Sequence, residues 1–388
     1  MKNRVMGVAA LAAVLVNACA PVPDDREEVA TANQALTVAV GQGAIAYDMG
    51  SVEGLPHGVA GDRRLVFVSE ALSGSVSVHR RLTGKAIADL PAPPGGFALP
   101  FALRVPQDGT LVVLDAGGFP DPSQPSVPVV YEYSYGLHHG AFHATLERTI
   151  SFAGLPLAFV EDLEVLPDGR YVVSESVLGA LWVVNTDGTI EMGVFPASFD
   201  PADAVPGLNP CGLPAGLVID GIPFAPPGMF APGVGSLAAR DGWLYFGNSC
   251  LGGVRRIPVA SLSDTTRLPF ERGADIEVVS PRPQGVSFEV LKGLAFNRWS
   301  NDDRLFALDA TGLGAVRIDV ETGAREALVQ DAELFNFPVS AQFLPPLLGV
   351  SPVVVISDQE HRLAAFNTGI GEDQLVPPFL ITKVFLAP

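Results

Sequence analysis

Six short apolar strands along the chain end on an acidic or amide side chain, and this repeat constrains the fold more than any other feature. The end residues are Glu70, Asp115, Glu175, Asn248, Asp309 and Asp358. Most of them precede a glycine-bearing turn and a second strand-like run, and successive copies lie several tens of residues apart. Repeats of that length built from short strands are typical of β-propellers, with one copy per blade. The sequence therefore predicts an all-β chain folded as a six-bladed β-propeller.

The N-terminal residues have the pattern of a targeting segment. Lys2 and Arg4 precede an apolar run over 5–16 that is too short to span a bilayer. The run leads into Ala18-Cys19, which resembles the lipobox of bacterial lipoproteins. The resemblance implies cleavage before Cys19, acylation of that cysteine and a place in the bacterial cell envelope, with Ala20 favouring the outer membrane. The alternative is an ordinary secretory signal cut after Ala18 or Ala20.

These patterns divide the chain into three parts. Residues 1–18 are the expected signal peptide, 19–35 a polar tether and 36–388 the propeller. Strand-like runs at both ends of the last part predict that the chain termini pair within one blade, which leaves few open sheet edges. The third strand of the sixth blade is expected at 362–366.

The net charge limits the classes of molecule that this chain is expected to bind. The chain carries 24 basic and 42 acidic residues, a formal charge of −18. Such a charge repels nucleic acid and anionic membrane surfaces, so membrane contact is expected only through the lipid. The expected partner of this chain, which we predict to be a monomer, is a small-molecule ligand or an envelope protein.

Two cysteines remain once Cys19 is assigned to the lipid. Cys211 lies in a long proline-rich segment between blades three and four, and Cys250 lies in a turn of blade four. Both segments belong to the same end of the propeller, and disulfides persist in exported proteins. We therefore predict a Cys211–Cys250 disulfide, with two buried thiols or a metal pair as the alternatives.

Propeller topology brings candidate site residues to one end of the central channel. The innermost strand of each blade begins at this end, which we call the front mouth, and the second strand returns to it. The six strand-end residues are therefore expected around the front mouth, together with residues at the starts of the innermost strands: His57, Phe101, Glu161, Asp162, Gly235, Ser236, Lys292, Ser340 and Gln342.

A ring of carboxylates and an amide suits calcium, which takes six to eight oxygen ligands. The candidate metal ligands are Glu161, Asn248, Asp309 and Asp358. The alternative is structural, because Asp and Asn at strand ends often cap the turn that follows.

Three residues are candidates for catalysis. Glu161 and Lys292 each precede a strand whose alternation points them towards the channel, and His57 is a histidine expected at the front mouth. A carboxylate beside an ammonium suits general acid–base chemistry. The same two residues are equally consistent with a buried ion pair that has no catalytic role.

Two segments resemble a known superfamily. Residues 160–170, with Val-Glu-Asp-Leu-Glu-Val-Leu-Pro-Asp-Gly-Arg, and 291–296, with Leu-Lys-Gly-Leu-Ala-Phe, resemble blades of the regucalcin/gluconolactonase and strictosidine synthase-like propellers. In regucalcin-type lactonases, Glu, Asn and Asp at the starts of innermost strands hold a divalent metal. Glu161 matches an acidic ligand, whereas Lys292 stands at the place of the asparagine ligand. Only Glu161 therefore carries over from that ligand set.

Three functions follow from these features. The first is an envelope-anchored hydrolase of a lactone or ester, acting at the front mouth with calcium or substrate bound there. The second is a non-catalytic propeller that binds a ligand or protein, because fold does not imply function. A weaker third is a lyase or condensing enzyme that uses Glu161 or His57 as its base.

Overall fold

The fold was analysed in a computed structural model of the chain. The structure describes residues 39–40, 44–118, 127–195, 211–212, 217–224, 230–231, 233–248, 251–347, 349–364, 367 and 370–386. Short strands dominate these residues, and the α-helices among them, such as α2 (Val259–Leu262) and α3 (Pro269–Arg272), are single turns. None of the helices in the described ranges is long and apolar enough to cross a membrane.

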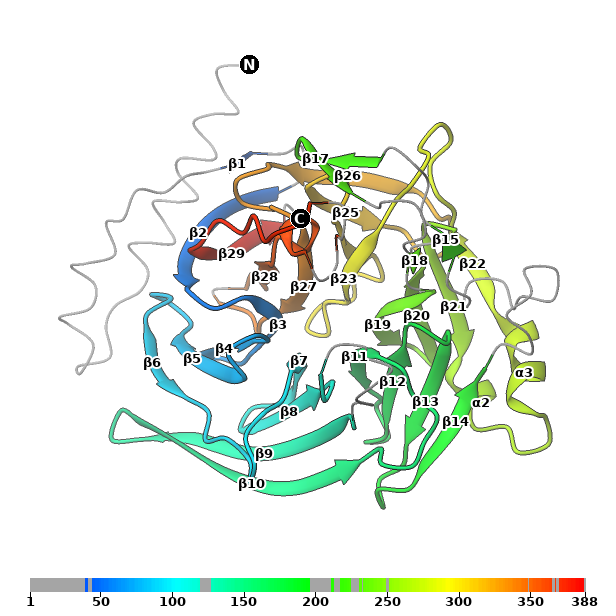
Figure 1. Cartoon of the computed structure of the whole chain (residues 1–388), viewed down its shortest axis with the longest axis horizontal. Helices are drawn as coiled ribbons and strands as arrows, with labels where there is room; N and C mark the ends of the chain where they lie inside the picture. The colour runs from blue at the N-terminus through cyan, green and yellow to red at the C-terminus, as the bar shows by residue number, and fades with distance from the viewer. Residues whose placement is uncertain are drawn as a thin grey trace.

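The predicted six-bladed β-propeller is confirmed (Figure 1). Five blades are four-stranded antiparallel sheets formed by consecutive strands. Blade one comprises β3 (Pro56–Gly61), β4 (Leu65–Glu70), β5 (Ser75–Arg80) and β6 (Ala86–Asp89). Blade two comprises β7 (Pro100–Gln107), β8 (Thr110–Asp115), β9 (Val129–His138) and β10 (Ala141–Ser151). Blade three comprises β11 (Val160–Val165), β12 (Tyr171–Glu175), β13 (Ala180–Val184) and β14 (Ile190–Val194).

The next two blades repeat the same order, and the first strand of each lies innermost. Blade four comprises β19 (Val234–Arg240), β20 (Trp243–Asn248), β21 (Val254–Pro258) and β22 (Glu277–Ser280). Blade five comprises β23 (Leu291–Ala295), β24 (Leu305–Asp309), β25 (Gly314–Ile318) and β26 (Arg325–Gln330). The second strands are almost wholly buried, because neighbouring blades pack apolar side chains against both of their faces.

Blade six closes the ring with both ends of the chain, as the sequence predicted. Its order from the channel outward is β27 (Pro338–Phe343), β28 (Val353–Ser357), β29 (Phe379–Leu386), β2 (Ala44–Val52) and β1 (Ala39–Val40). β2 pairs antiparallel with β29 from Ala44↔Leu386 to Val52↔Phe379. This pairing joins the two ends of the chain by backbone hydrogen bonds, which leaves no break between the first and last blades.

The prediction of a third strand at 362–366 is wrong, because β29 is the third strand of blade six. Residues Glu360–Arg362 instead form a single 3-10 turn, η3. Gln359, directly before η3, adopts a left-handed conformation with φ 57°, which turns the chain away from the direction of β28. This turn matters for function, because it directs Glu360 into the front mouth.

The long segment between blades three and four forms two small sheets that lie outside the blades. β15 (Cys211–Gly212) pairs with β18 (Phe230–Ala231), and β16 (Leu217–Ile219) pairs with β17 (Ile222–Phe224). The β16–β17 hairpin packs on blade six. Phe224 contacts Phe337 with ring centroids 5.9 Å apart, and Asp220 forms an ion pair of 2.5 Å with Arg362 of η3.

Candidate functional site

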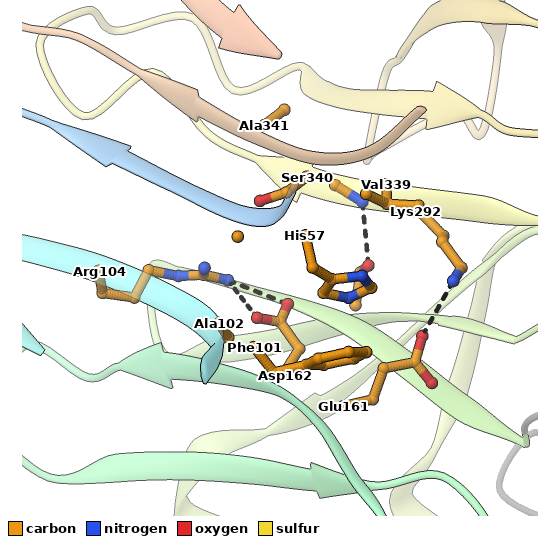
Figure 2. Close-up of a pocket in the computed structure, with 13 residues that line it drawn as sticks. His57, Phe101, Ala102, Arg104, Glu161, Asp162, Lys292, Val339, Ser340 and Ala341 are labelled. Carbon is orange, nitrogen blue, oxygen red and sulfur yellow. Dashed lines mark hydrogen bonds and ion pairs between the residues drawn. The ribbon is translucent and has the colours of Figure 1, made fainter. Parts of the chain in front are cut away.

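A pocket at the front mouth takes at least one side chain from the innermost strand of every blade (Figure 2). We call it the mouth pocket. It is lined by His57, Gly58, Phe101, Ala102, Arg104, Glu161, Asp162, Ser236, Lys292, Gly293, Val339, Ser340 and Ala341. The structure thus brings the three predicted catalytic residues, Glu161, Lys292 and His57, to one place. The cavity measures about 10 Å³, which is room for about one water molecule.

A β-bulge at the start of every innermost strand explains how so many residues face one pocket. The pairing of the first and second strands shifts register within 56–59, 100–102, 160–162, 234–237, 292–295 and 338–340. A bulge inserts an unpaired residue and turns neighbouring side chains to new directions. Consecutive residues such as Glu161 and Asp162 therefore both line the pocket, which strict strand alternation forbids.

Serine hydroxyls accept hydrogen bonds from backbone N–H groups at several of these bulges. Ser69 Oγ accepts from Gly58 N at 2.7 Å, and Ser174 Oγ accepts from Asp162 N at 2.9 Å. Ser236 Oγ accepts from Gly293 N at 2.9 Å, across the boundary between blades four and five. These bonds satisfy buried donors that have no partner in the sheet, so the bulges hold one conformation.

The centre of the front mouth is an ammonium held by carboxylates. Lys292 Nζ lies 2.6 Å from Glu360 Oε2 and 3.6 Å from Glu161 Oε1, and all three side chains are largely buried. Burial opposes the charge of Lys292, but the carboxylates of Glu360 and Glu161 outweigh it and raise the pKa of Lys292. Burial raises the pKa of Glu161 to about 7, although the Lys292 ammonium opposes that shift. Glu161 therefore changes charge near neutral pH.

His57 lies beside this group and is fixed on two sides. Its ring stacks on Phe101 with centroids 3.4 Å apart, and its Nδ1 lies 3.0 Å from Asp358 Oδ2. Burial and the charge of Lys292 lower the pKa of His57 to about 3, so the ring is neutral at physiological pH. Burial also raises the pKa of Asp358 to about 7. Within the described residues, Nε2 of His57 has no hydrogen-bond partner.

A second ion pair, between blades two and three, also lines the mouth pocket. Arg104 Nη2 donates to both carboxylate oxygens of Asp162 at 2.9 and 3.0 Å, and Arg104 Nε donates to Glu164. Asp162 also accepts from the backbone N of Leu237 at 2.8 Å. One carboxylate thereby connects blades two, three and four. Figure 2 shows this pair on the side of the pocket opposite Lys292.

Most strand-end residues serve turns rather than the pocket. Asp115 accepts from the backbone N of Ala98, Leu99 and Gly117, and Glu175 accepts from Ala158, Phe159 and Leu178. These donors lie in the segment that leads into the innermost strand of the same blade and in the turn after the second strand. The structural alternative, in which strand-end residues cap turns, therefore accounts for these carboxylates.

The four predicted metal ligands do not lie together in one site. Asn248 bonds the backbone of Gly233 and Leu251, and Asp309 bonds Thr311 and Gly312 of its own turn. Asp358 bonds His57, and Glu161 faces Lys292. In the part of the chain that the structure describes, no three His, Cys, Asp or Glu side chains are arranged to hold a metal ion. The residues at the front mouth therefore do not fit calcium, because a fixed ammonium lies among their oxygens.

Sequence reasoning missed two residues of the site. Arg104 lies on an innermost strand, where an arginine inside an apolar run was an available signal. Glu360 lies outside the repeat, and only the left-handed turn at Gln359 brings it to Lys292. The lipidation of Cys19 and the Cys211–Cys250 disulfide remain predictions from the sequence. Cys19 and Cys250 lie outside the described residues, and only the backbone of Cys211 is described.

Comparison with known proteins relates this architecture to solved propellers. No protein-family model and no curated protein matches the chain. A gluconolactonase from Xanthomonas campestris aligns over 91% of this chain and 96% of its own, with a TM-score of 0.51 and 12% identity. A calcium-binding regucalcin from Agrobacterium tumefaciens aligns over 90% and 95%, with a TM-score of 0.51 and 13% identity. The chain has the gluconolactonase and regucalcin propeller fold.

A luciferin-regenerating enzyme is also similar, over 89% of this chain and 98% of its own, with a TM-score of 0.54 and 10% identity. At these identities the likeness concerns the fold alone. The family resemblance expected from 160–170 and 291–296 is thus supported at the level of architecture. The chemistry of this propeller has to be argued from its own mouth pocket.

Proposed function

We propose that this propeller is a hydrolase of a lactone or ester that acts at the front mouth. One observation carries the proposal: Glu161 and Lys292 face each other at 3.6 Å in a buried pocket with room for about one water molecule. A carboxylate whose pKa lies near 7 is suited to remove a proton from water at neutral pH. An adjacent ammonium is suited to stabilise negative charge on a carbonyl oxygen.

The proposed reaction assigns a separate role to each group. Glu161 takes a proton from the water as its oxygen attacks the carbonyl carbon, and Lys292 stabilises the developing oxyanion. The carbon–oxygen bond of the lactone or ester then breaks, and the leaving alkoxide takes the proton from Glu161. The products are a carboxylic acid and an alcohol. His57, held by Asp358 and Phe101, presents Nε2 for a hydrogen bond to the substrate.

The volume of the pocket favours a second candidate, a propeller that binds a ligand or protein without turnover. About 10 Å³ does not admit a lactone, so a substrate carbonyl has to approach from the front mouth. Buried ion pairs at such a position need no catalytic role.

A panel of substrates distinguishes the hydrolase from the non-catalytic binding propeller. Purified protein is assayed with five- and six-membered lactones and with aryl esters, beside Glu161→Gln and the surface control Asp168→Asn. The hydrolase predicts turnover that falls by about 100-fold or more in Glu161→Gln and is unchanged in the control. No turnover by the wild type on any of these compounds contradicts the hydrolase and favours the binding function.

We further propose that the protein is attached to the bacterial envelope, with the outer membrane favoured, through a lipid on Cys19. The support is the apolar run over 5–16 that leads into Ala18-Cys19. Fractionation of cells that express Cys19→Ser tests this: the variant is expected in the soluble fraction and the wild type in the membrane fraction. Equal distribution of the two proteins contradicts the anchor.

A further inference from the structure

Lys292 is a cation surrounded by acidic side chains. Its Nζ contacts Glu360 and Glu161, and the negative charge of Asp358 also favours the protonated form of Lys292. The side chains of Lys292, Glu161 and Glu360 are 7%, 8% and 13% exposed, so water contributes little to their solvation. Buried carboxylates require a counter-charge, because an unpaired charge in such a place is strongly unfavourable.

The ammonium also occupies the space between these oxygens. Calcium needs six to eight oxygens at 2.3–2.6 Å, whereas Nζ already lies 2.6 Å from Glu360 Oε2. Nζ further lies 5.7 Å from the centre of the Phe337 ring, so an apolar ring rather than an oxygen ligand faces that side of the ammonium. The free volume of the pocket is about 10 Å³. A metal ion and Lys292 therefore exclude each other by charge and by volume.

We propose that the Lys292 ammonium takes the place of a divalent metal ion at the front mouth. The site is then complete without a metal, and removal of the ammonium converts it into a divalent-cation site. This inference holds whether or not the front mouth hydrolyses a substrate, because it concerns only which cation neutralises Glu161 and Glu360. It differs from calcium binding at a wild-type site, which the acidic residues alone suggested.

Lys292→Asn is the variant that tests the inference. The shorter side chain vacates the position of Nζ, removes the positive charge and adds an amide oxygen as a ligand. Glu161 and Glu360 remain as carboxylate ligands, and water fills the other positions. We expect the variant to bind one calcium ion with a Kd below about 1 mM, the range of weak extracellular sites. The wild type is expected to bind none at the front mouth.

Calorimetric titration with calcium chloride and thermal unfolding, both after removal of metals with a chelator, provide the readouts. With calcium about 100-fold above Kd, binding to the folded state alone raises the Tm of Lys292→Asn by about 3–4 °C. Lys85→Asn is the matched control, since it makes the same change in charge at an exposed turn. If calcium binds only non-specifically to the acidic surface, it raises the Tm of Lys85→Asn as much as the Tm of Lys292→Asn.

The outcomes separate clearly. Saturable calcium binding by Lys292→Asn that disappears in Lys292→Asn/Glu360→Gln supports the inference. No binding by a folded Lys292→Asn overturns it, as does one-to-one binding by the wild type that is lost in Glu161→Gln. If Lys292→Asn does not fold in chelator, refolding in about 5 mM calcium is the second measurement. Rescue by calcium supports the inference, and failure of rescue overturns it.

Discussion

The Nδ1 atom of His57 lies 3.0 Å from Oδ2 of Asp358, although the two residues are 301 positions apart. His57 lies on the innermost strand of blade one, and Asp358 follows the second strand of blade six. The bond therefore crosses the boundary between the first and the last blade, beside the place where β2 and β29 close the ring. It connects the closure of the fold directly to the candidate site.

Asp358→Ala is expected to lower the free energy of unfolding by about 1–3 kcal/mol, because His57 Nδ1 and the backbone N of Glu360 lose their acceptor. His57→Phe keeps a ring on Phe101 and removes the other half of the pair. In a double-mutant cycle from urea unfolding, the double variant is expected to lose less stability than the sum of the two single variants. Additive losses contradict a direct interaction.

Glu161→Gln is expected to gain stability relative to the wild type as the pH rises from 4.5 to 7. Burial raises the pKa of Glu161 from 4.5 to about 7, so the folded state keeps a proton that the unfolded state releases in this window. The wild type is therefore destabilised with rising pH, by about 2–3 kcal/mol in total, whereas glutamine does not titrate. Urea unfolding of both proteins at pH 4, 5, 6, 7 and 8 measures the difference, and a difference independent of pH contradicts the prediction.

Asp162→Asn is expected to lower the free energy of unfolding by about 1.5–3 kcal/mol, because the buried guanidinium of Arg104 loses its closest carboxylate and keeps only Glu164 as an ionic partner. Asp168→Asn is the matched control. Asp168 pairs with Arg170 at 2.8 Å, but its side chain is 52% exposed, and exposed pairs contribute at most about 1 kcal/mol. Chemical unfolding of the two variants measures both values, and similar losses refute the structural role assigned to Asp162.

Asp115→Ala is expected to lower stability by about 1–3 kcal/mol without altering any activity of the folded protein. The side chain accepts from two backbone N–H groups before β7 and from one in the turn after β8, and it does not line the mouth pocket. Thermal unfolding measures the loss, and the lactone and ester panel measures activity. Loss of turnover in a fully folded Asp115→Ala assigns the strand-end ring a functional role and contradicts the structural one.

The Cys211–Cys250 disulfide remains a prediction from the sequence. Peptide mass spectrometry after alkylation without reductant is expected to show the two cysteines in one cross-linked peptide pair. Complete alkylation of both cysteines in the unreduced protein rules out the bridge. Reduction is then expected to leave the six blades folded, since their strands pair without that segment.

The repeat of strand ends predicted the blades because each copy carries its own turn chemistry and apolar strands, which are local properties of the chain. The position of Glu161 was also predicted, but for an incomplete reason. Alternation along β11 points Glu161 towards the channel and Asp162 away from it, whereas the bulge between Val160 and Asp162 brings both into the pocket. Bulges leave no clear mark in a single sequence, because they depend on pairing with the neighbouring strand.

The sequence by itself determined the six-bladed architecture, the closure by both termini and the strand starts that face the front mouth. These features follow from apolar periodicity and turn residues, which act over a few positions. The tertiary structure decided which charges meet. Glu360 reaches Lys292 only through the turn at Gln359, and Asp358 reaches His57 only across the blade boundary. Charge pairing depends on distances of a few ångströms between segments hundreds of residues apart, and local patterns do not specify such distances.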